Sequence, residues 1–185
     1  LSITSSWGNG HATTYRALIR ELAARGHSIT FLERDVPWYR ENRDFPHSKF
    51  CDIRLYSDLD ELRTKYCELV RQADAVMIGS YVPDGIEAAR WVLSNAEGLT
   101  VFYDIDTPVT ITDLKARKCE YLSAELIPEF DLYLSFTGGP ILKEIEQRFG
   151  ASCARLLACS VDPRLYFPEH CSEHTWEVGY LGTYS

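Results

Sequence analysis

The chain lacks an excess of basic residues. It has 19 Lys and Arg against 27 Asp and Glu, which gives a formal net charge of −8 at pH 7. Nucleic-acid binding needs a basic face that neutralises phosphates, so this balance argues against a nucleic-acid partner. Long apolar runs are also absent, and none reaches the roughly 20 residues that cross a bilayer. We therefore expect neither a nucleic-acid partner nor a transmembrane segment.

The sequence also lacks closely spaced pairs of cysteines. The six cysteines are scattered and none forms a CxxC pair, so their spacing matches no closed zinc site. Free thiols in a reducing cytosol are the preferred interpretation over disulfides, and they favour a cytoplasmic location. A zinc site at His170, Cys171 and His174 with an upstream cysteine is the weaker hypothesis, against a solvated linker. We expect no bound metal.

The composition that remains is that of a folded domain. Hydrophobic residues make up 45% and charged residues 25% of the 185 residues, which is globular composition. Apolar runs alternate with amphipathic helical patterns, and no internal repeat is present. This alternation predicts an α/β fold, Rossmann-like and doubly wound, with a mainly parallel sheet. The expected strands are 1–6, 28–33, 53–56, 75–80, 100–103, 132–136 and 155–159. The expected helices are 11–25, 59–70, 86–96 and 141–149, with one or two short helices in 109–129.

A glycine-rich stretch, Trp-Gly-Asn-Gly-His at 7–11, joins the first expected strand to the first helix. Its glycines let the backbone approach a ligand, and the helix start offers free N–H groups. Doubly wound folds bind ligands beyond the carboxyl ends of their strands, where this stretch lies. The loops 79–85, 104–108 and 137–140 follow other strand ends. We expect all four loops to line one rim.

Three titratable residues in these loops are candidates for catalysis. His11 stands at a helix start, where the dipole disfavours the charged imidazole, and a neutral imidazole suits a general base. Its alternative role is only to cap the helix or to bond to a neighbouring loop. Asp104 and Asp106 lie two apart, so on a strand their carboxylates point to one side and would converge on a cation. A base, or a group that orients His11, is the preferred role. In the alternative, one of these carboxylates caps the next helix.

Other loop residues are candidates for substrate binding through side chains or backbone groups. They are Gly8, Asn9, Gly10, Ser80, Tyr81, Asp84, Thr107, Thr137, Gly138 and Gly139. Three further aromatic residues, Trp38, Tyr39 and Trp91, are suited to stacking on sugar rings. Apolar packing under a loop is the commoner fate of such side chains.

A dinucleotide site is an alternative interpretation of the first loop. Gly8 and Gly10 match part of the fingerprint, but Thr13 stands where its third glycine or alanine belongs. Glu33 ends the second expected strand, as NAD binding requires. The remaining interpretation is that the glycines only form a tight turn.

Five stretches together resemble a known family along the whole chain. They are WGNGHATTYRAL (7–18), FLERDVPWY (31–39), FYDIDTP (102–108), DLYLSFTGGP (131–140) and CSVDP (159–163). They are similar to the N-terminal half of bacterial glycosyltransferases of the CgeB-like (spore maturation) type. The resemblance implies a GT-B architecture, in which two Rossmann-like domains face each other across a cleft.

The resemblance also implies a division of labour between the two domains. Residues 1–160 would be the acceptor-side domain, 161–176 the inter-domain linker and 177–185 the start of a donor-binding domain. The full protein would transfer a sugar from a nucleotide-sugar donor to a hydroxyl acceptor without a cofactor. Because Leu1 already lies in a strand-like run and the last residues begin a new strand, we expect a fragment. Such a fragment would be inactive alone and would dimerise through its exposed cleft face.

One departure from the related enzymes concerns catalysis. Many related retaining enzymes carry a His-Asp pair at the end of the strand near residue 103, where this chain has Tyr103 and Asp104. The role of that histidine therefore cannot be assigned here, and His11 or the two aspartates remain as candidates. The alternative functions are an NAD- or nucleotide-binding Rossmann module and a non-catalytic sugar-recognition domain.

Overall fold

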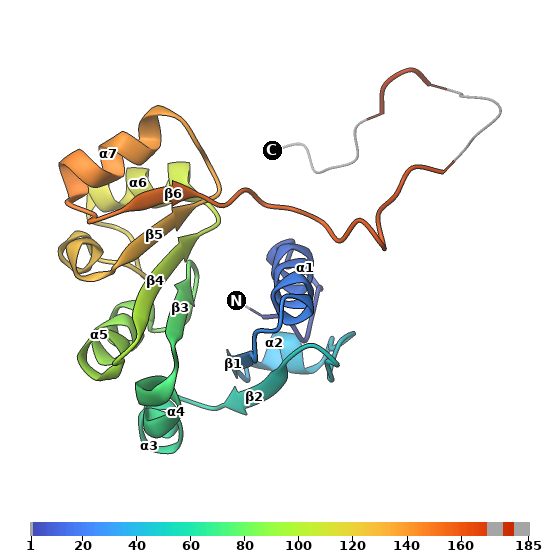
Figure 1. Ribbon diagram of the computed structural model, residues 1–185, viewed down its shortest axis with the longest axis horizontal. Coiled ribbons are helices and arrows are strands. Elements are labelled where there is room, and N and C mark those ends of the chain that lie inside the picture. The colour runs from blue at the N-terminus through green and yellow to red at the C-terminus, as the bar shows by residue number, and fades with distance from the viewer. Residues whose placement is uncertain (1, 170–175, 180–185) are drawn as a thin grey trace.

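The computed structural model describes residues 2–169 and 176–179, and it has the expected α/β fold (Figure 1). Every strand pair within the described residues is parallel. The strands are β1 (Thr30–Arg34), β2 (Asp52–Tyr56), β3 (Ala75–Gly79), β4 (Leu99–Asp104), β5 (Leu132–Ser135) and β6 (Ala154–Leu156). Helices occupy the connections between them, as parallel pairing requires. None of the helices in the described residues has the length and apolar character needed to cross a membrane.

The helices follow the expected order with small differences. They are α1 (His11–Ala24), α2 (Pro37–Arg40), α3 (Leu59–Lys65), α4 (Cys67–Gln72), α5 (Gly85–Asn95), α6 (Thr107–Ala116), the 3₁₀ helix η1 (Ala124–Glu129) and α7 (Pro140–Phe149). The helix expected over 59–70 is divided at Tyr66, whose hydroxyl donates to the carbonyl of Leu55 at 3.2 Å. Of the strand expected from 177, residues 177–179 are not in a strand, and 180–185 lie outside the described residues.

The strands form two sheets, and the first expected strand is missing. One sheet has the order β1-β2 and the other β3-β4-β5-β6. Residues 2–6 form no ladder, because the N–H groups of Ile3 and Thr4 donate to the carboxylate of Glu33, at 2.7 and 3.1 Å. A buried carboxylate thus replaces a strand carbonyl as the acceptor. As a result, β1 and β3 each have a single strand neighbour within the described residues.

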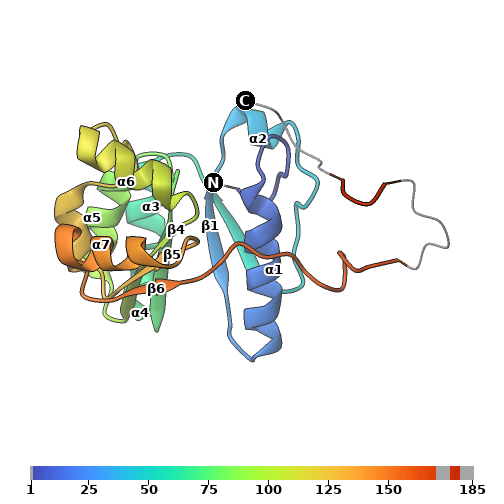
Figure 2. The same ribbon diagram turned by 90° about the horizontal axis from the view of Figure 1, so that it is seen from above.

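The four-stranded sheet has α5, α6 and α7 on one face and α1 on the other (Figure 2). Phe102 of β4 belongs to the larger apolar cluster, with Phe130 and Tyr133 at ring-centroid distances of 5.6 and 5.4 Å. Its neighbour Tyr103 belongs to a second cluster and lies 5.6 Å from the ring of Tyr15 in α1. Successive strand residues point to opposite faces. This confirms the doubly wound arrangement around β4.

The segment after β6 crosses the surface of α1 (Figure 1). The hydroxyl of Thr14 donates to the carbonyl of Ser160 at 3.3 Å, and Arg20 forms an ion pair with Asp162. The Asp162 side chain also accepts from the backbone N–H of Arg164 at 2.9 Å. Residues 160–166, which we call the strap, are therefore fastened to the helix whose first residue is His11.

Candidate functional site

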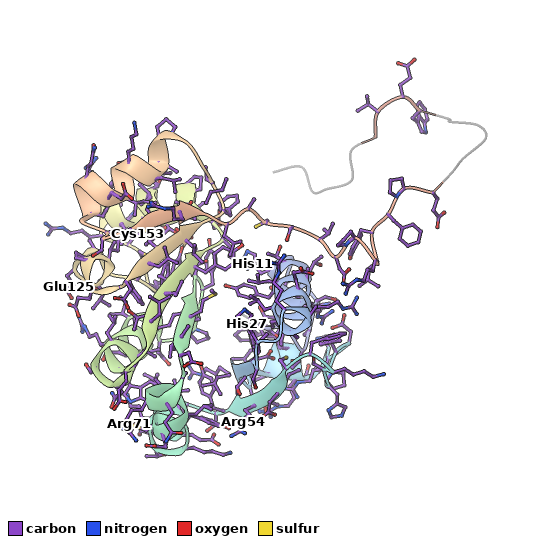
Figure 3. The ribbon with its side chains drawn as sticks, in the orientation of Figure 1. His11, His27, Arg54, Arg71, Glu125 and Cys153 are labelled. Atoms are coloured by element: carbon purple, nitrogen blue, oxygen red, sulfur yellow. The ribbon has the colours of Figure 1, made fainter. Side chains whose placement is uncertain are left out.

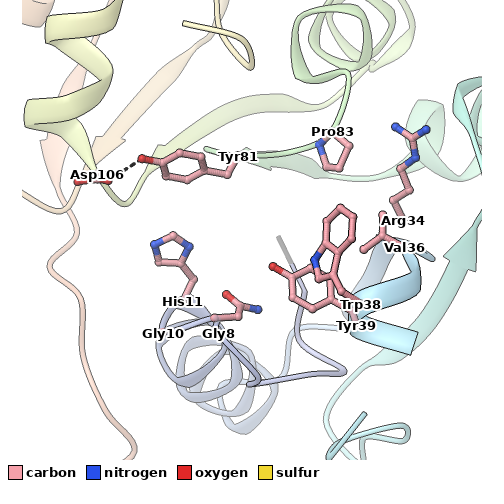
Figure 4. A pocket seen from close by; sticks show the side chains of 11 residues that line it. Gly8, Gly10, His11, Arg34, Val36, Trp38, Tyr39, Tyr81, Pro83 and Asp106 are labelled. Atoms are coloured by element: carbon pink, nitrogen blue, oxygen red, sulfur yellow. Dashed lines mark hydrogen bonds between the residues drawn. The ribbon is translucent and has the colours of Figure 1, made fainter. Parts of the chain in front are cut away.

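A pocket of about 420 Å³ lies at the carboxyl ends of β1, β3 and β4 (Figure 4). Its volume falls within the range of roughly 300–1,000 Å³ that is usual for small-molecule sites. It is lined by Gly8, Asn9, Gly10, His11, Arg34, Val36, Trp38, Tyr39, Tyr81, Pro83 and Asp106. Three of the four loops expected at one rim therefore contribute to a single cavity.

The loop before α1 is held in place by its own hydrogen bonds and by a glycine. Gly8 has φ +56°, in the left-handed region that glycine adopts without strain. The side-chain nitrogen of Asn9 donates to the carbonyls of Ser2 and Ser5, at 2.8 and 3.1 Å. Asn9 was expected to contact substrate and does line the pocket, while its amide nitrogen fixes the loop. The loop therefore presents the start of α1 to the pocket in a defined position.

Tyr81 lies between the two catalytic candidates of the pocket. Its hydroxyl donates to the Asp106 carboxylate at 2.6 Å, and its ring stacks on His11 with centroids 5.7 Å apart. On the other side, the ring of Tyr121 lies 4.7 Å away. Burial and the bond to Asp106 raise the pKa of Tyr81 to about 12, so its hydroxyl keeps its proton near neutral pH.

The backbone around Tyr81 is strained. Tyr81 has φ +62° and Asp84 has φ +52°, a region that costs a side-chain-bearing residue about 1 kcal/mol or more. The ion pair between Asp84 and Arg34 fastens the far end of this loop to β1. Strain of this kind concentrates at ligand sites, where surrounding contacts keep it in place.

His11 lies in the pocket wall. Burial lowers the pKa of its imidazole from the ordinary value of 6.5, which favours the neutral form at pH 7, and the charge of Asp106 opposes that shift. Figure 4 shows its ring directed toward Tyr81 and Asp106. The neutral form has a lone pair that can take a proton, and the nearby carboxylate favours the imidazolium that results. This is the chemistry of a general base.

Asp104 and Asp106 diverge, although they are two residues apart. Asp104 is fully buried, and its carboxylate accepts from Tyr133 at 2.6 Å and from Thr110 at 2.8 Å. Asp106 lies beyond the end of β4, where strand alternation no longer applies, and it faces the pocket. Burial raises the pKa of Asp104. The two carboxylates do not converge, so Asp104 does not reach a substrate in the pocket.

The remaining candidates from the sequence lie behind or beside the cavity. Ser80 and Thr107 are fully buried: Ser80 accepts from the N–H of Ile105 at 3.2 Å, and Thr107 bonds to Ser135 at 2.7 Å. Thr137, Gly138 and Gly139 precede α7, and the pocket lining does not include them. Asp84 acts through Arg34 rather than as a wall of the pocket.

Sequence patterns missed several pocket residues. Arg34, Val36 and Pro83 line the pocket but were not named as candidates, although Arg34 and Val36 lie in the stretch 31–39 and Pro83 lies in the loop 79–85. Arg34 also ends a strand, and the carboxyl end of a parallel strand was a further signal. In the sequence, Trp38 and Trp91 are equally open to stacking on a sugar ring and to apolar packing under a loop. Trp91 packs against the core, whereas Trp38 lines the pocket with 53% of its surface exposed.

Glu33, the acidic residue that the dinucleotide interpretation needs, does not face the pocket. Glu33 is 1% exposed. One carboxylate oxygen accepts from the hydroxyls of Ser2 and Thr4 and the other from the N–H groups of Ile3 and Thr4. Both oxygens are therefore turned into the protein and not toward a ribose.

The metal hypotheses find no further support. Among residues 2–169 and 176–179, no three His, Cys, Asp or Glu side chains are grouped to hold a metal ion. The zinc hypothesis at His170, Cys171 and His174 lies outside the described residues.

Comparison of the chain with protein-family profiles, curated protein sequences and solved structures finds no match.

Proposed function

We propose that this chain is the acceptor-side domain of a GT-B glycosyltransferase, which transfers a sugar from a nucleotide-sugar donor to a hydroxyl acceptor. The observation that carries the proposal is the pocket in which the His11 ring stacks on Tyr81, whose hydroxyl donates to Asp106. A base, a carboxylate and polar backbone at the carboxyl edge of a parallel sheet suit the activation of a hydroxyl group.

The proposed transfer uses His11 as the base. The acceptor oxygen forms a bond to the anomeric carbon of the donor while the bond from that carbon to the diphosphate breaks. The acceptor proton passes to His11, and the electron pair of the broken bond leaves with the diphosphate. Asp106 favours the imidazolium formed on His11, since its charge raises the pKa of that ring.

Asp104 and Tyr81 serve this reaction indirectly. Asp104 holds Thr110, whose hydroxyl also bonds to Tyr121 at 2.7 Å, and Tyr121 packs on Tyr81. Tyr81 in turn holds the Asp106 carboxylate at 2.6 Å. We assign Asp104 as a positioning residue and not as a catalytic one. Groups that bind the donor diphosphate are proposed to belong to the second GT-B domain.

The test measures released nucleotide from a panel of nucleotide sugars, using the full-length protein that the GT-B proposal implies. We expect His11→Ala to lower kcat by roughly 10²- to 10⁴-fold, as removal of a general base does, and Asp106→Asn to lower it less. His27→Ala is the matched control, because His27 is exposed beyond the other end of α1 (Figure 3). Release from no donor by the folded protein, or full activity of His11→Ala, would refute the proposal.

A cytoplasmic location and a homodimer through an exposed face accompany this proposal as predictions. Light scattering at high protein concentration tests the second of them, and a strictly monomeric species would contradict it.

A further inference from the structure

The short helix α2 contributes little to the core. None of its residues Pro37–Arg40 is buried, yet it carries two large aromatic side chains, Trp38 and Tyr39. Their rings pack edge-to-face with centroids 5.8 Å apart, and Trp38 keeps 53% of its surface exposed. A tryptophan gains stability by burial, so one left half-exposed inside a pocket is suited to contact a ligand.

The aromatic pair Trp38 and Tyr39 and the polar group of His11, Tyr81 and Asp106 line different parts of the same pocket. Figure 4 shows Trp38 and Tyr39 near Val36, and His11 facing Tyr81 and Asp106. A ligand that fills the cavity therefore meets an aromatic surface in one part and hydrogen-bonding groups in the other. A sugar ring has this duality, with C–H groups on its faces and hydroxyls around its edge.

The charges of the pocket favour a neutral ligand. Arg34, the cation of the lining, is paired with Asp84, and its Nε donates to the carbonyl of Ser57 at 3.2 Å. Burial lowers the pKa of His11, which favours the uncharged ring at pH 7. The carboxylate of Asp106 adds a negative group. Among the described lining residues, no cation without a carboxylate partner remains to hold a phosphate or carboxylate.

We propose that the acceptor is a neutral carbohydrate, with one sugar ring stacked on Trp38 and a hydroxyl directed to His11 and Asp106. Trp38 then determines specificity by selecting acceptors with a sugar ring over simple alcohols. This inference rests on the proposed function for the transfer step, but the binding of the sugar is tested without turnover.

The experiment is isothermal titration of the 185-residue chain with maltotriose, cellotriose and chitotriose, and with glucose 6-phosphate as the charged probe. We expect at least one neutral trisaccharide to bind, and the phosphorylated sugar to bind more weakly. Trp38→Ala is expected to weaken binding about tenfold, the usual scale of a well-placed aromatic contact. Trp38→Phe, which keeps an aromatic face, should recover most of the affinity.

Trp176→Ala is the matched control, because Trp176 is 79% exposed and does not line the pocket. Unfolding curves of Trp38→Ala should match those of the parent chain, since Trp38 is not buried in the core. Equal affinity of Trp38→Ala and the parent chain would overturn the inference. Binding of none of the three trisaccharides, or tighter binding of glucose 6-phosphate, would also overturn it.

The outcome is separable from the test of the proposed function. Trisaccharide binding that depends on Trp38, together with a failure to release nucleotide, would leave a carbohydrate-binding domain without transferase activity. Nucleotide release that depends on His11, with no trisaccharide binding, would leave a transferase acting on another class of hydroxyl acceptor.

Discussion

Removal of the Glu33 carboxylate is expected to destabilise the whole N-terminal segment. Glu33 is 1% exposed and accepts from the N–H groups of Ile3 and Thr4, at 2.7 and 3.1 Å, and from the Ser2 hydroxyl at 2.7 Å. Residues 2–4 form no strand ladder, so this side chain is their principal acceptor. These residues lead directly into the loop that carries Gly8 to His11.

The magnitude follows from the groups left without a partner. Glu33→Ala removes the acceptor of two buried N–H groups, and each such loss costs about 1–3 kcal/mol. We therefore expect the free energy of unfolding to fall by about 2–6 kcal/mol. In Glu33→Gln the amide oxygen still faces the N–H groups, and its nitrogen can donate to the hydroxyls of Ser2 and Thr4. The cost should then be about 1 kcal/mol, the difference between charged and neutral hydrogen bonds.

The assay is urea unfolding followed by circular dichroism, with Glu41→Ala as the matched control. Glu41 is exposed, so its loss should change the free energy of unfolding by no more than about 0.5 kcal/mol. A Glu33→Ala variant as stable as Glu41→Ala would refute the argument.

Three further predictions concern the base, the strap and two glycines. The acid limb of the kcat/KM profile should lie below pH 6.5, because burial lowers the pKa of His11 and the base acts only when neutral, above that pKa; a pH–rate series measures it. Arg20→Ala should release the strap and speed tryptic cleavage after Arg164 several-fold, since the Arg20–Asp162 pair fastens this segment to α1. Gly98→Ala should lower the free energy of unfolding in urea by roughly 1–3 kcal/mol, because the added Cβ would overlap the backbone carbonyl oxygen of Ala73. Gly10→Ala should not show this loss, because its Cβ would meet nothing within 4 Å.

Each of these predictions has a control or a contradicting outcome. The acid limb should disappear in His11→Ala, and a limb that persists unchanged would assign it to another group. Arg25→Ala removes a more exposed arginine at the end of α1, which forms an ion pair with Glu21 and not with the strap. Cleavage as fast as in Arg20→Ala would count against the role of the Arg20–Asp162 pair. Equal losses of stability in Gly98→Ala and Gly10→Ala would show that the close approach to the carbonyl is not the cause.

The sequence by itself determined the fold class and the edge of the sheet at which the pocket lies. Alternation of apolar runs with amphipathic helices is a local property, and it was sufficient to predict parallel strands and loops 7–11, 79–85 and 104–108 at one rim. These three loops line the pocket, with His11 at its wall as expected. The loop 137–140 follows β5 and lies outside the pocket lining. The prediction that it would join the other three loops was wrong, because a local sequence pattern does not show how far apart two strands lie in the sheet.

Only the tertiary structure decided which side chains face the pocket. Asp104 and Asp106 look equivalent in sequence, but the end of β4 turns one inward to Tyr133 and leaves the other in the cavity. Trp38 and Trp91 also look alike in the sequence, but Trp38 lines the pocket and Trp91 packs against the core. Residues 2–6 have the pattern of a strand, yet Glu33, about 30 residues away in the chain, takes their N–H groups. Such choices depend on contacts between distant segments, and the local periodicity of a sequence does not encode them.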